Sequence, residues 1–312
     1  MNTHENLQAL LLTTDQLLCR GLSGQAIRRA VSAGDLIRIR PGFYVDNHAR
    51  ALGRSDRHML SILAANAALD APVFSHSSAA IIHGLPDWGL SLGRLSLAEE
   101  GTTTRTRSTR QAKFHSVRNL SEHVTSVNGI LVTTPERTIT DIALSSRRDA
   151  SVTVADAALK RTLITKDELA NSLEKSAGRH GIRRARYSMS LVDEKSESVA
   201  ETLSRLTFLD FDIPKPETQV EVFNDRGVLV ARADFLWREF GVIGECDGFG
   251  KYFNGRSPIE TRQELAKEKD RDAELMALGH RVVHWRWHDI EEPIRLATRI
   301  RRVLFATGSS HA

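Results

Sequence analysis

The stretch Arg232-Ala-Asp-Phe-Leu-Trp-Arg-Glu-Phe-Gly-Val-Ile-Gly-Glu-Cys-Asp-Gly248 decides the fold of the C-terminal half. It predicts two short strands joined by a turn, with Asp234 on the first and Glu245 and Asp247 on and directly after the second. Glu245 and Asp247 share a face because side chains repeat every second residue along a strand, and Asp234 can join them if the strands are neighbours. Buried carboxylates are costly unless something pairs with them. A hard divalent cation, Mg²⁺ or Mn²⁺, is the partner we expect, in a metal-dependent centre that cleaves phosphodiesters.

The segments around this stretch predict an α+β domain. A helix begins after Ser198, three strands form a meander, a long helix follows, and a last strand and helix close the domain. The predicted strands and the later helices are 218–223, 229–237, 241–246, 259–278, 281–287 and 292–305.

This order, combined with Asp234 and the Glu245-x-Asp247 pair, resembles the PD-(D/E)XK nuclease superfamily and is closest to its small Vsr-like branch. The resemblance covers roughly residues 196–305. It is carried by Arg232-Ala-Asp-Phe, Gly244-Glu-Cys-Asp-Gly248 and the run from Lys269 to Val283. It implies a restriction-endonuclease-like fold.

By position, the resemblance implies that Asp234 and Glu245 hold the metal. Glu201 matches the helix acid that some members use as an extra ligand or base. Glu201 also completes a capping box with Ser198, so its role stays open. Gln219 either contacts the phosphate or faces solvent.

The chain departs from the superfamily pattern at one place. A lysine is expected two residues after the glutamate, and Asp247 stands there. Either Asp247 is a further ligand, or the catalytic lysine comes from elsewhere, with Lys251 as the first candidate and Lys269 as the second. The alternatives are a degenerate centre, or acids that only pair with arginines such as Arg232 or Arg271.

Histidines and tryptophans near the last strand do not extend this site. His280, His284 and His288 repeat every four residues, a spacing that does not converge on a strand, so we do not expect them to be ligands. Trp285 and Trp287 are predicted to share a strand face in the core.

The N-terminal residues predict a helix, a turn, a second helix and a basic hairpin. Thr13-x-x-Gln16 has a capping-box pattern, and Ser23 caps a helix that ends at Gly34. A hairpin turning at Pro41-Gly42 follows, which is the order of a winged helix-turn-helix. The predicted DNA contacts are Gln25, Arg28, Arg29 and Ser32 on the helix, and Arg38 and Arg40 on the wing. A solvated basic face and a protein-docking module are the alternatives.

The middle of the chain predicts a mixed α/β unit. Ser55 is predicted to cap a helix, Asn128-Gly129 turns a hairpin, and Pro135 begins a helix. His76 and His83 are more simply packed and hydrogen-bonded than ligands. The basic run 102–111 is a solvated loop or an edge strand that meets DNA.

The first half of the chain resembles AbiE-type (type IV) antitoxins. The likeness is carried by the segment from Leu11 through Val45, by Phe74-Ser-His-Ser-Ser-Ala-Ala-Ile-Ile-His-Gly84 and by Thr133-Thr-Pro-Glu-Arg-Thr-Ile-Thr-Asp-Ile-Ala143. It implies a DNA-binding, self-repressing regulator.

Composition fits this interpretation. The chain of 312 residues has a net charge of +4 and a pI near 9.2. This mild excess of positive charge suits binding to nucleic acid. No apolar run is long enough to span a membrane. Cys19 and Cys246 lie in segments predicted to belong to different domains, so we do not expect a disulfide between them. We expect a cytoplasmic protein.

The predicted domains are 1–48 (winged helix-turn-helix), 49–148 (antitoxin-like), 149–195 (helical connector, including a basic connector at 178–186) and 196–312 (nuclease-like). The leading interpretation is a DNA-binding, antitoxin- or defence-related protein with a Mg²⁺-dependent endonuclease domain. The alternative is a non-catalytic repressor or type IV antitoxin whose nuclease fold is degenerate. DNA, a cognate toxin and a second copy of the chain are the expected partners.

Overall fold

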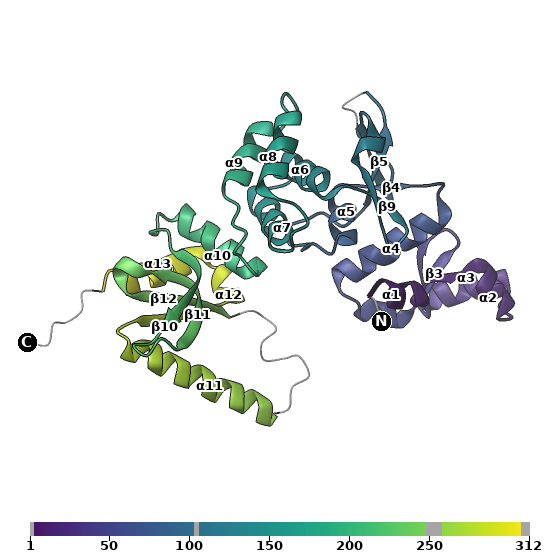
Figure 1. The fold of residues 1–312 in the computed structure, drawn as a ribbon. Coiled ribbons are helices and arrows are strands. Elements are labelled where there is room, and N and C mark those ends of the chain that lie inside the picture. Colours follow the sequence, from purple (N-terminus) through teal and green to yellow (C-terminus); the bar gives the residue numbers. More distant parts are fainter. Residues whose placement is uncertain (1–2, 103–105, 248–257, 307–312) are drawn as a thin grey trace, which may run out of the picture. The chain divides into compact units, whose positions relative to one another are not determined.

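The computed structural model describes residues 3–102, 106–247 and 258–306. The chain forms two compact units, Met1–Leu191 and Val192–Ala312 (Figure 1). Lys251 and Gly248 lie outside the described residues. In the described part of the chain, no helix is long and apolar enough to cross a membrane.

The first unit begins with a small helical subdomain and a hairpin. Its elements are α1 (Thr3–Leu10), β1 (Leu12–Thr13), α2 (Thr14–Cys19), α3 (Gly24–Ala33), β2 (Leu36–Arg40), β3 (Phe43–Asp46) and the 3-10 helix η1 (Asn47–Ala51). The predicted capping box is confirmed, since the side chains of Thr13 and Gln16 each accept a hydrogen bond from the other's backbone N–H. Ser23 caps α3, and Gly34 ends it with a left-handed φ of 84°. The predicted helix, turn, helix and hairpin are therefore all present.

The hairpin forms a three-stranded sheet with β1, in the order β1-β3-β2. Beneath α2 and α3 lies a small core of Leu17, Ile27 and Tyr44. On the opposite side Ile37 and Ile39 pack against the larger core that α4 and the following sheet build. The wing is thus anchored to the middle of the chain.

A six-stranded sheet follows in the order β6-β7-β5-β4-β9-β8. The strands are β4 (Val73–Phe74), β5 (Leu95–Glu100), β6 (Thr106–Ser108), β7 (Ala112–Val117), β8 (Val124–Val127) and β9 (Ile130–Thr133), with the 3-10 helix η2 (Leu120–His123) before β8. The Asn128-Gly129 hairpin is confirmed. Strand β6 stands at the edge of the sheet, which favours the edge-strand alternative for the basic run.

Helices complete the first unit. They are α4 (Arg54–Ala68), α5 (His76–Ile82), α6 (Pro135–Ser145), α7 (Arg148–Lys160), α8 (Lys166–Lys175) and α9 (Ile182–Ser190).

Two local predictions were wrong. The cap of α4 is Gly53, because the helix begins before Ser55. The predicted basic connector becomes helix α9 from Ile182 onward, because Ala185 and Met189, four residues apart, bury one face of it.

Asp141 ties the helices together. Its carboxylate is fully buried and accepts hydrogen bonds from Arg137 Nε at 2.7 Å and Arg179 Nη2 at 2.8 Å. The first contact is the predicted i,i+4 ion pair, and the second joins α6 to the segment between α8 and α9. The two arginines offset the cost of burying the charge.

The histidines of this unit are packed, as predicted for His76 and His83. The ring of His76 stacks on that of His115, with centroids 3.7 Å apart. His83 Nε2 lies 2.8 Å from the carbonyl oxygen of Thr133. Burial lowers the pKa of His58, His76 and His83, and burial together with His76 lowers the pKa of His115 to about 3.

The second unit has the predicted order of elements. These are α10 (Val199–Asp210), β10 (Glu217–Phe223), β11 (Leu229–Trp237), the 3-10 helix η3 (Arg238–Phe240), β12 (Val242–Asp247), α11 (Pro258–Ala277), β13 (Arg281–Arg286), α12 (Trp287–Ile290) and α13 (Pro293–Leu304). The sheet order is β10-β11-β12-β13, antiparallel except for the parallel pair β12-β13. The connection between the two parallel strands contains α11, as parallel pairing requires.

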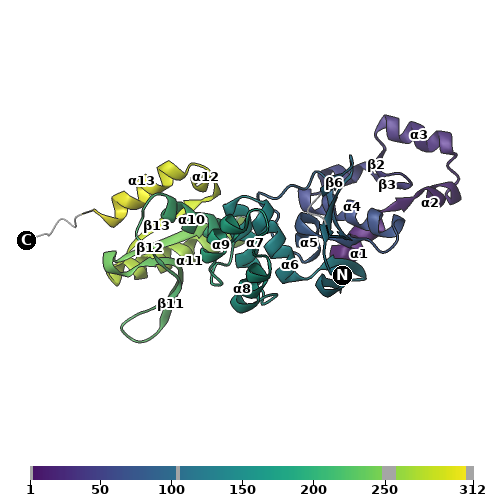
Figure 2. The same cartoon turned by 90° about the horizontal axis from the view of Figure 1, so that it is seen from above.

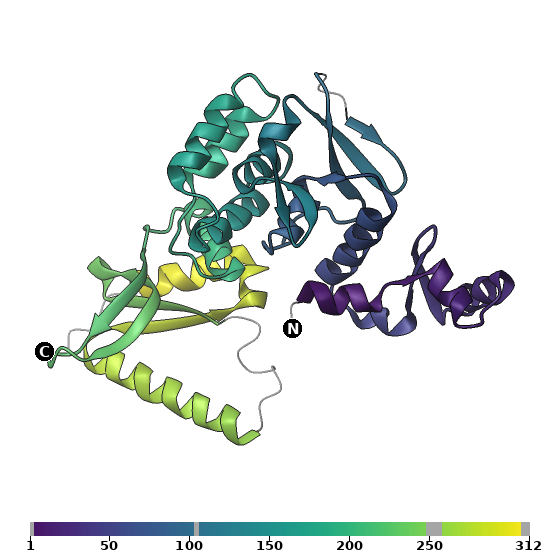
Figure 3. The ribbon, with the colours of Figure 1, turned by 45° about the vertical axis from the view of Figure 1, so that its right-hand side comes forward.

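Helix α11 covers one face of this sheet, and α10 and α13 cover the other (Figures 1 and 3). Phe208, Phe235, Trp237 and Trp285 form an aromatic cluster on the second face. Residue 244 must be glycine there, because a Cβ would come within 2.7 Å of the Trp285 ring. The prediction that Trp287 shares this face was wrong, since β13 ends at Arg286 and Trp287 begins α12.

The packed histidines predict a pH dependence. A histidine whose pKa is lower in the folded than in the unfolded state binds its proton mainly after unfolding. Stability therefore falls as the pH drops below the unfolded pKa of about 6.5. Urea unfolding followed by circular dichroism should show lower stability at about pH 5.5 than at about pH 7.5. In His115→Asn the loss of unfolding free energy between these two pH values should be smaller by up to about 1 kcal/mol. An equal loss in this variant and in the wild type would contradict the lowered pKa of folded His115.

Candidate functional site

Helix α3 presents one polar face to solvent. Ile27 is buried, whereas the polar residues predicted to contact DNA, Gln25, Arg28, Arg29 and Ser32, are all exposed. The buried apolar residue fixes the rotation of the helix, and the four polar side chains are left on the opposite side. In Figures 1 and 2, α2 and α3 form the end of the first unit farthest from α8 and α9.

The wing residues differ from each other. Arg38 is exposed, but Arg40 is half-buried, because the pairing of β2 with β3 shifts between these two residues. Burial lowers the pKa of Arg40. Arg40 lines a cavity of about 200 Å³ together with Arg94 and Arg110, and none of the described residues around that cavity is acidic.

In the second unit, the amide of Gln219 joins two of the predicted catalytic acids. Its Nε2 donates to Glu201 Oε2 at 2.9 Å and to Asp234 Oδ1 at 3.1 Å. Asp234 Oδ2 accepts from the backbone N–H of Cys246 at 2.8 Å. Asp234 of β11 therefore lies directly beside β12, as predicted, and Gln219 contacts the acids and does not simply face solvent.

Glu201 serves the start of α10 as well. Its carboxylate accepts from the backbone N–H of Glu197 at 3.0 Å and from Ser198 Oγ at 2.8 Å. Burial, and then the nearby charge of Asp234, raises the pKa of Glu201. Ser198 Oγ caps α10 by accepting from Glu201 N–H at 3.1 Å, but the predicted capping box does not form, because the Glu201 carboxylate accepts from the N–H of Glu197 and not from that of Ser198. Burial also raises the pKa of the Cys246 thiol to about 12.

Glu245 and Asp247 are buried on β12 and meet side chains of α11 and β13. Glu245 Oε2 lies 3.8 Å from Arg271 Nη2, and Asp247 Oδ2 lies 3.8 Å from His284 Nδ1. The arginine predicted as an alternative partner is therefore near Glu245. Arg232, the other arginine named, pairs with Glu197 at 2.6 Å.

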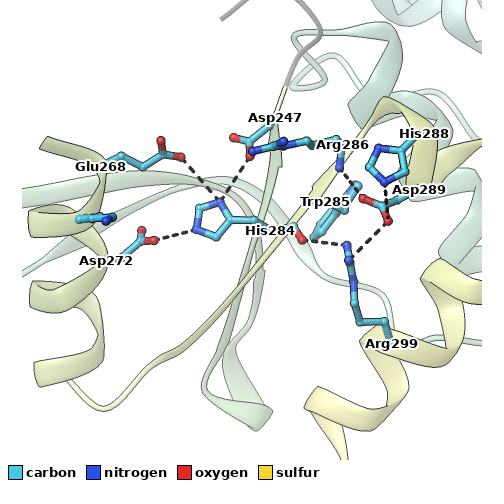
Figure 4. A pocket seen from close by; sticks show the side chains of 10 residues that line it. Asp247, Glu268, Asp272, His284, Trp285, Arg286, His288, Asp289 and Arg299 are labelled. Atoms are coloured by element: carbon cyan, nitrogen blue, oxygen red, sulfur yellow. Dashed lines mark hydrogen bonds and ion pairs between the residues drawn. The ribbon is translucent and has the colours of Figure 1, made fainter. Parts of the chain in front are cut away.

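A polar cluster surrounds His284 (Figure 4). His284 Nε2 lies 2.8 Å from Asp272 Oδ2, while Nδ1 lies 3.9 Å from Glu268 Oε1. These residues line a pocket of about 450 Å³ that also contains Lys269, the second candidate for the missing lysine. Lys251, the first candidate, lies outside the described residues.

The structure thus places three of the four predicted acids in two groups, while Glu245 lies near Arg271. Asp234 and Glu201 meet through Gln219, whereas Asp247 faces His284 and Glu268. Of the three histidines, His284 and His288 line the same pocket, and His288 is exposed and lies 3.5 Å from Asp289 Oδ1. His284 itself, with Glu268 and Asp272, was missed. A signal existed: Glu268, Arg271, Asp272 and Leu275 follow the i, i+3, i+4, i+7 spacing of one helix face.

Two regions of the chain match models of known families. Residues 8–45 match a family described as transcriptional regulator, AbiEi antitoxin. Residues 74–191 match the AbiEi antitoxin C-terminal domain. These matches support the antitoxin-type, DNA-binding part of the sequence resemblance. The nuclease-like resemblance of residues 196–305 stays a prediction.

Two uncharacterized proteins, one from each of two strains of Mycobacterium tuberculosis, are similar over nearly the whole chain. Each is 28% identical over 287 residues, which cover 91% of this chain and 97% of the relative. The likeness therefore extends through both units.

The hydrogen bond from Cys246 N–H to Asp234 predicts a structural cost of mutation. Asp234→Ala removes the acceptor of a partly buried backbone donor, so we expect the second unit to lose about 1–3 kcal/mol of stability. Asp234→Asn retains one oxygen and should lose less. Urea unfolding monitored by tryptophan fluorescence measures both variants, and equal stability of Asp234→Ala and wild type would contradict this contact.

Proposed function

We propose that this protein is a DNA-binding regulator of the AbiEi antitoxin type. The observation that carries the proposal is the exposed face of α3, where Gln25, Arg28, Arg29 and Ser32 lie together beside a two-stranded wing. In a winged helix-turn-helix the second helix enters the major groove, and the wing lies along the backbone. Arginine and glutamine are the side chains that read guanine and adenine edges there.

The basic cavity extends this surface. Arg40 of the wing, Arg94 before β5 and Arg110 before β7 surround one space without an acidic neighbour among the described residues. Guanidinium groups bind phosphate through paired N–H donors. We assign this cavity to a backbone phosphate of the same DNA, so that the segments leading into β5 and β7 take part in binding.

The antitoxin descriptions of the matched families suggest a cognate toxin as a second partner. Within the proposal, the protein acts in the cytoplasm as a homodimer on a palindromic site, since winged-helix dimers read two half-sites. Repression of its own operon is the regulatory role that fits these partners.

A second activity is proposed for the second unit: metal-dependent cleavage of a phosphodiester. Glu201 and Asp234 are two acids held by one amide, and their mutual repulsion helps raise the pKa of Glu201. An all-oxygen donor set of this kind fits Mg²⁺ or Mn²⁺. Asp234 with Glu245 would hold the ion, which supplies water activation and charge neutralisation when bound. Glu201, with its raised pKa, is the residue placed to hold a proton.

One observation favours the non-catalytic alternative. Asp247 occupies the position where the nuclease pattern has a lysine, and its contacts lead to His284. Glu245 already has the guanidinium of Arg271 at 3.8 Å. Under the non-catalytic alternative, the second unit binds DNA or a partner toxin and does not cleave DNA.

DNA binding is tested with Arg28→Ala, which should weaken specific binding by about 1–3 kcal/mol and relax preference at one base pair. Arg94→Ala should weaken binding to all duplexes alike. It should also reduce the slope of log binding constant against log salt concentration by about 0.9, the value for one lost phosphate contact. Arg183→Ala, an exposed arginine on α9, is the matched control. Fluorescence anisotropy at several salt concentrations measures all three, and equal loss in the control would contradict the interface.

Cleavage is tested with Asp234→Asn, which keeps an acceptor for Cys246 N–H. We expect the wild type to nick plasmid DNA with Mg²⁺ or Mn²⁺ and the variant to lose this activity while its DNA affinity is unchanged. Nicking that persists in Asp234→Asn would exclude this centre. A wild type that binds DNA but does not nick it would establish the non-catalytic alternative.

A further inference from the structure

The imidazole of His284 stands among three carboxylates, one at hydrogen-bond distance and two farther away. Its Nε2 is 2.8 Å from Asp272 Oδ2, which is hydrogen-bond distance. Its Nδ1 faces two other carboxylates, Asp247 Oδ2 at 3.8 Å and Glu268 Oε1 at 3.9 Å. A charge-assisted hydrogen bond would be about 2.7–2.9 Å long. Figure 4 shows His284 between the three acids.

The bond to Asp272 fixes which nitrogen is available. With Asp272 as the acceptor at Nε2, Nδ1 is the ring nitrogen that faces Asp247 and Glu268. Histidines that bind metals commonly donate their other ring N–H to a carboxylate, which orients the ring.

The ligand geometry suits a cation of the right size. The three ligand atoms from Asp247, Glu268 and His284 all lie within 4.8 Å of one another. Two ligands at the zinc distances in a tetrahedral site are about 3.4 Å apart. The two pairs that include His284, at 3.8 and 3.9 Å, must therefore close by a few tenths of an ångström, and the pair of carboxylates by up to about 1.4 Å. The residues come from β12, α11 and β13, and the pocket beside them has room for water to complete the coordination.

Two arginines near the cluster also contact other acids. Arg299 lies 3.4 Å from Asp289 and donates to the carbonyl oxygen of His284. Arg271 lies near Glu245 and, at 3.9 Å, near Asp272. Lys269 is exposed, and Arg286 is exposed at the end of β13.

We propose that Asp247, Glu268 and His284 bind a divalent transition-metal ion, Zn²⁺ or Mn²⁺, with Asp272 orienting the histidine. A nitrogen ligand favours these ions over Mg²⁺, which prefers oxygen alone. The site does not depend on the proposed cleavage, because its ligands exclude Asp234 and Glu201. It fastens α11 to β12 and β13.

The test is calorimetric titration of Zn²⁺ and Mn²⁺ into the full-length, chelator-treated protein. Wild type should bind one ion at this site, and His284→Gln and Glu268→Gln should each bind it at least about tenfold more weakly. His288→Gln, an exposed histidine in the same pocket, is the matched control and should keep wild-type affinity. Asp272→Asn should weaken binding about 10–100-fold.

Cobalt(II) absorption gives a second readout that a general loss of folding would not imitate. Co²⁺ bound to the wild type should show a visible spectrum that His284→Gln changes while circular dichroism remains native. Absence of stoichiometric binding in wild type, or equal affinity in His284→Gln, would overturn the proposal. So would loss of binding in Asp234→Asn with His284→Gln unaffected, because the ion would then belong to the other acids.

Discussion

The second unit depends on the burial of two carboxylates in one strand. All six residues of β12 are buried, Glu245 and Asp247 among them. An isolated charge in such a position would cost several kcal/mol, so each neighbouring element must supply a compensating group. Helix α11 brings Arg271 toward Glu245, and β13 brings His284 toward Asp247. Asp141 in the first unit follows the same rule, because Arg137 and Arg179 each bind one of its carboxylate oxygens. There the contact joins helix α6 to the segment between α8 and α9.

The two units use charge in opposite ways. In the first, arginines stand exposed on α3 and β2 above a small apolar core, where they meet a large anion at little desolvation cost. In the second, acids are concentrated inside and around a pocket, where a small cation is the natural counterpart. A protein that contacts nucleic acid through one unit and metal through the other is consistent with both patterns, and with the antitoxin-type matches in the first 191 residues.

Local signals in the sequence predicted most elements, because caps, the Asn128-Gly129 turn and strand alternation act over a few residues. Helix α9 was missed because its basic residues masked a short buried stripe. The order of the six-stranded sheet depends on parallel pairs, β5 with β7 and β4 with β9, which local patterns do not specify. His284 and Glu268 could not be joined to Asp247 from spacing alone, because only the crossover through α11 brings them together. Asp234 beside β12 was predictable because the two strands are consecutive.

The central claim is that the first unit reads DNA sequence through α3. In vitro selection of bound duplexes from a random pool, using the full-length protein, tests it most directly. The account predicts enrichment of one motif by the wild type. It also predicts that Arg28→Ala/Arg29→Ala retains weak binding but loses the preference at the bases beneath the helix. Failure to enrich any motif, or an identical motif from the double variant, would contradict it.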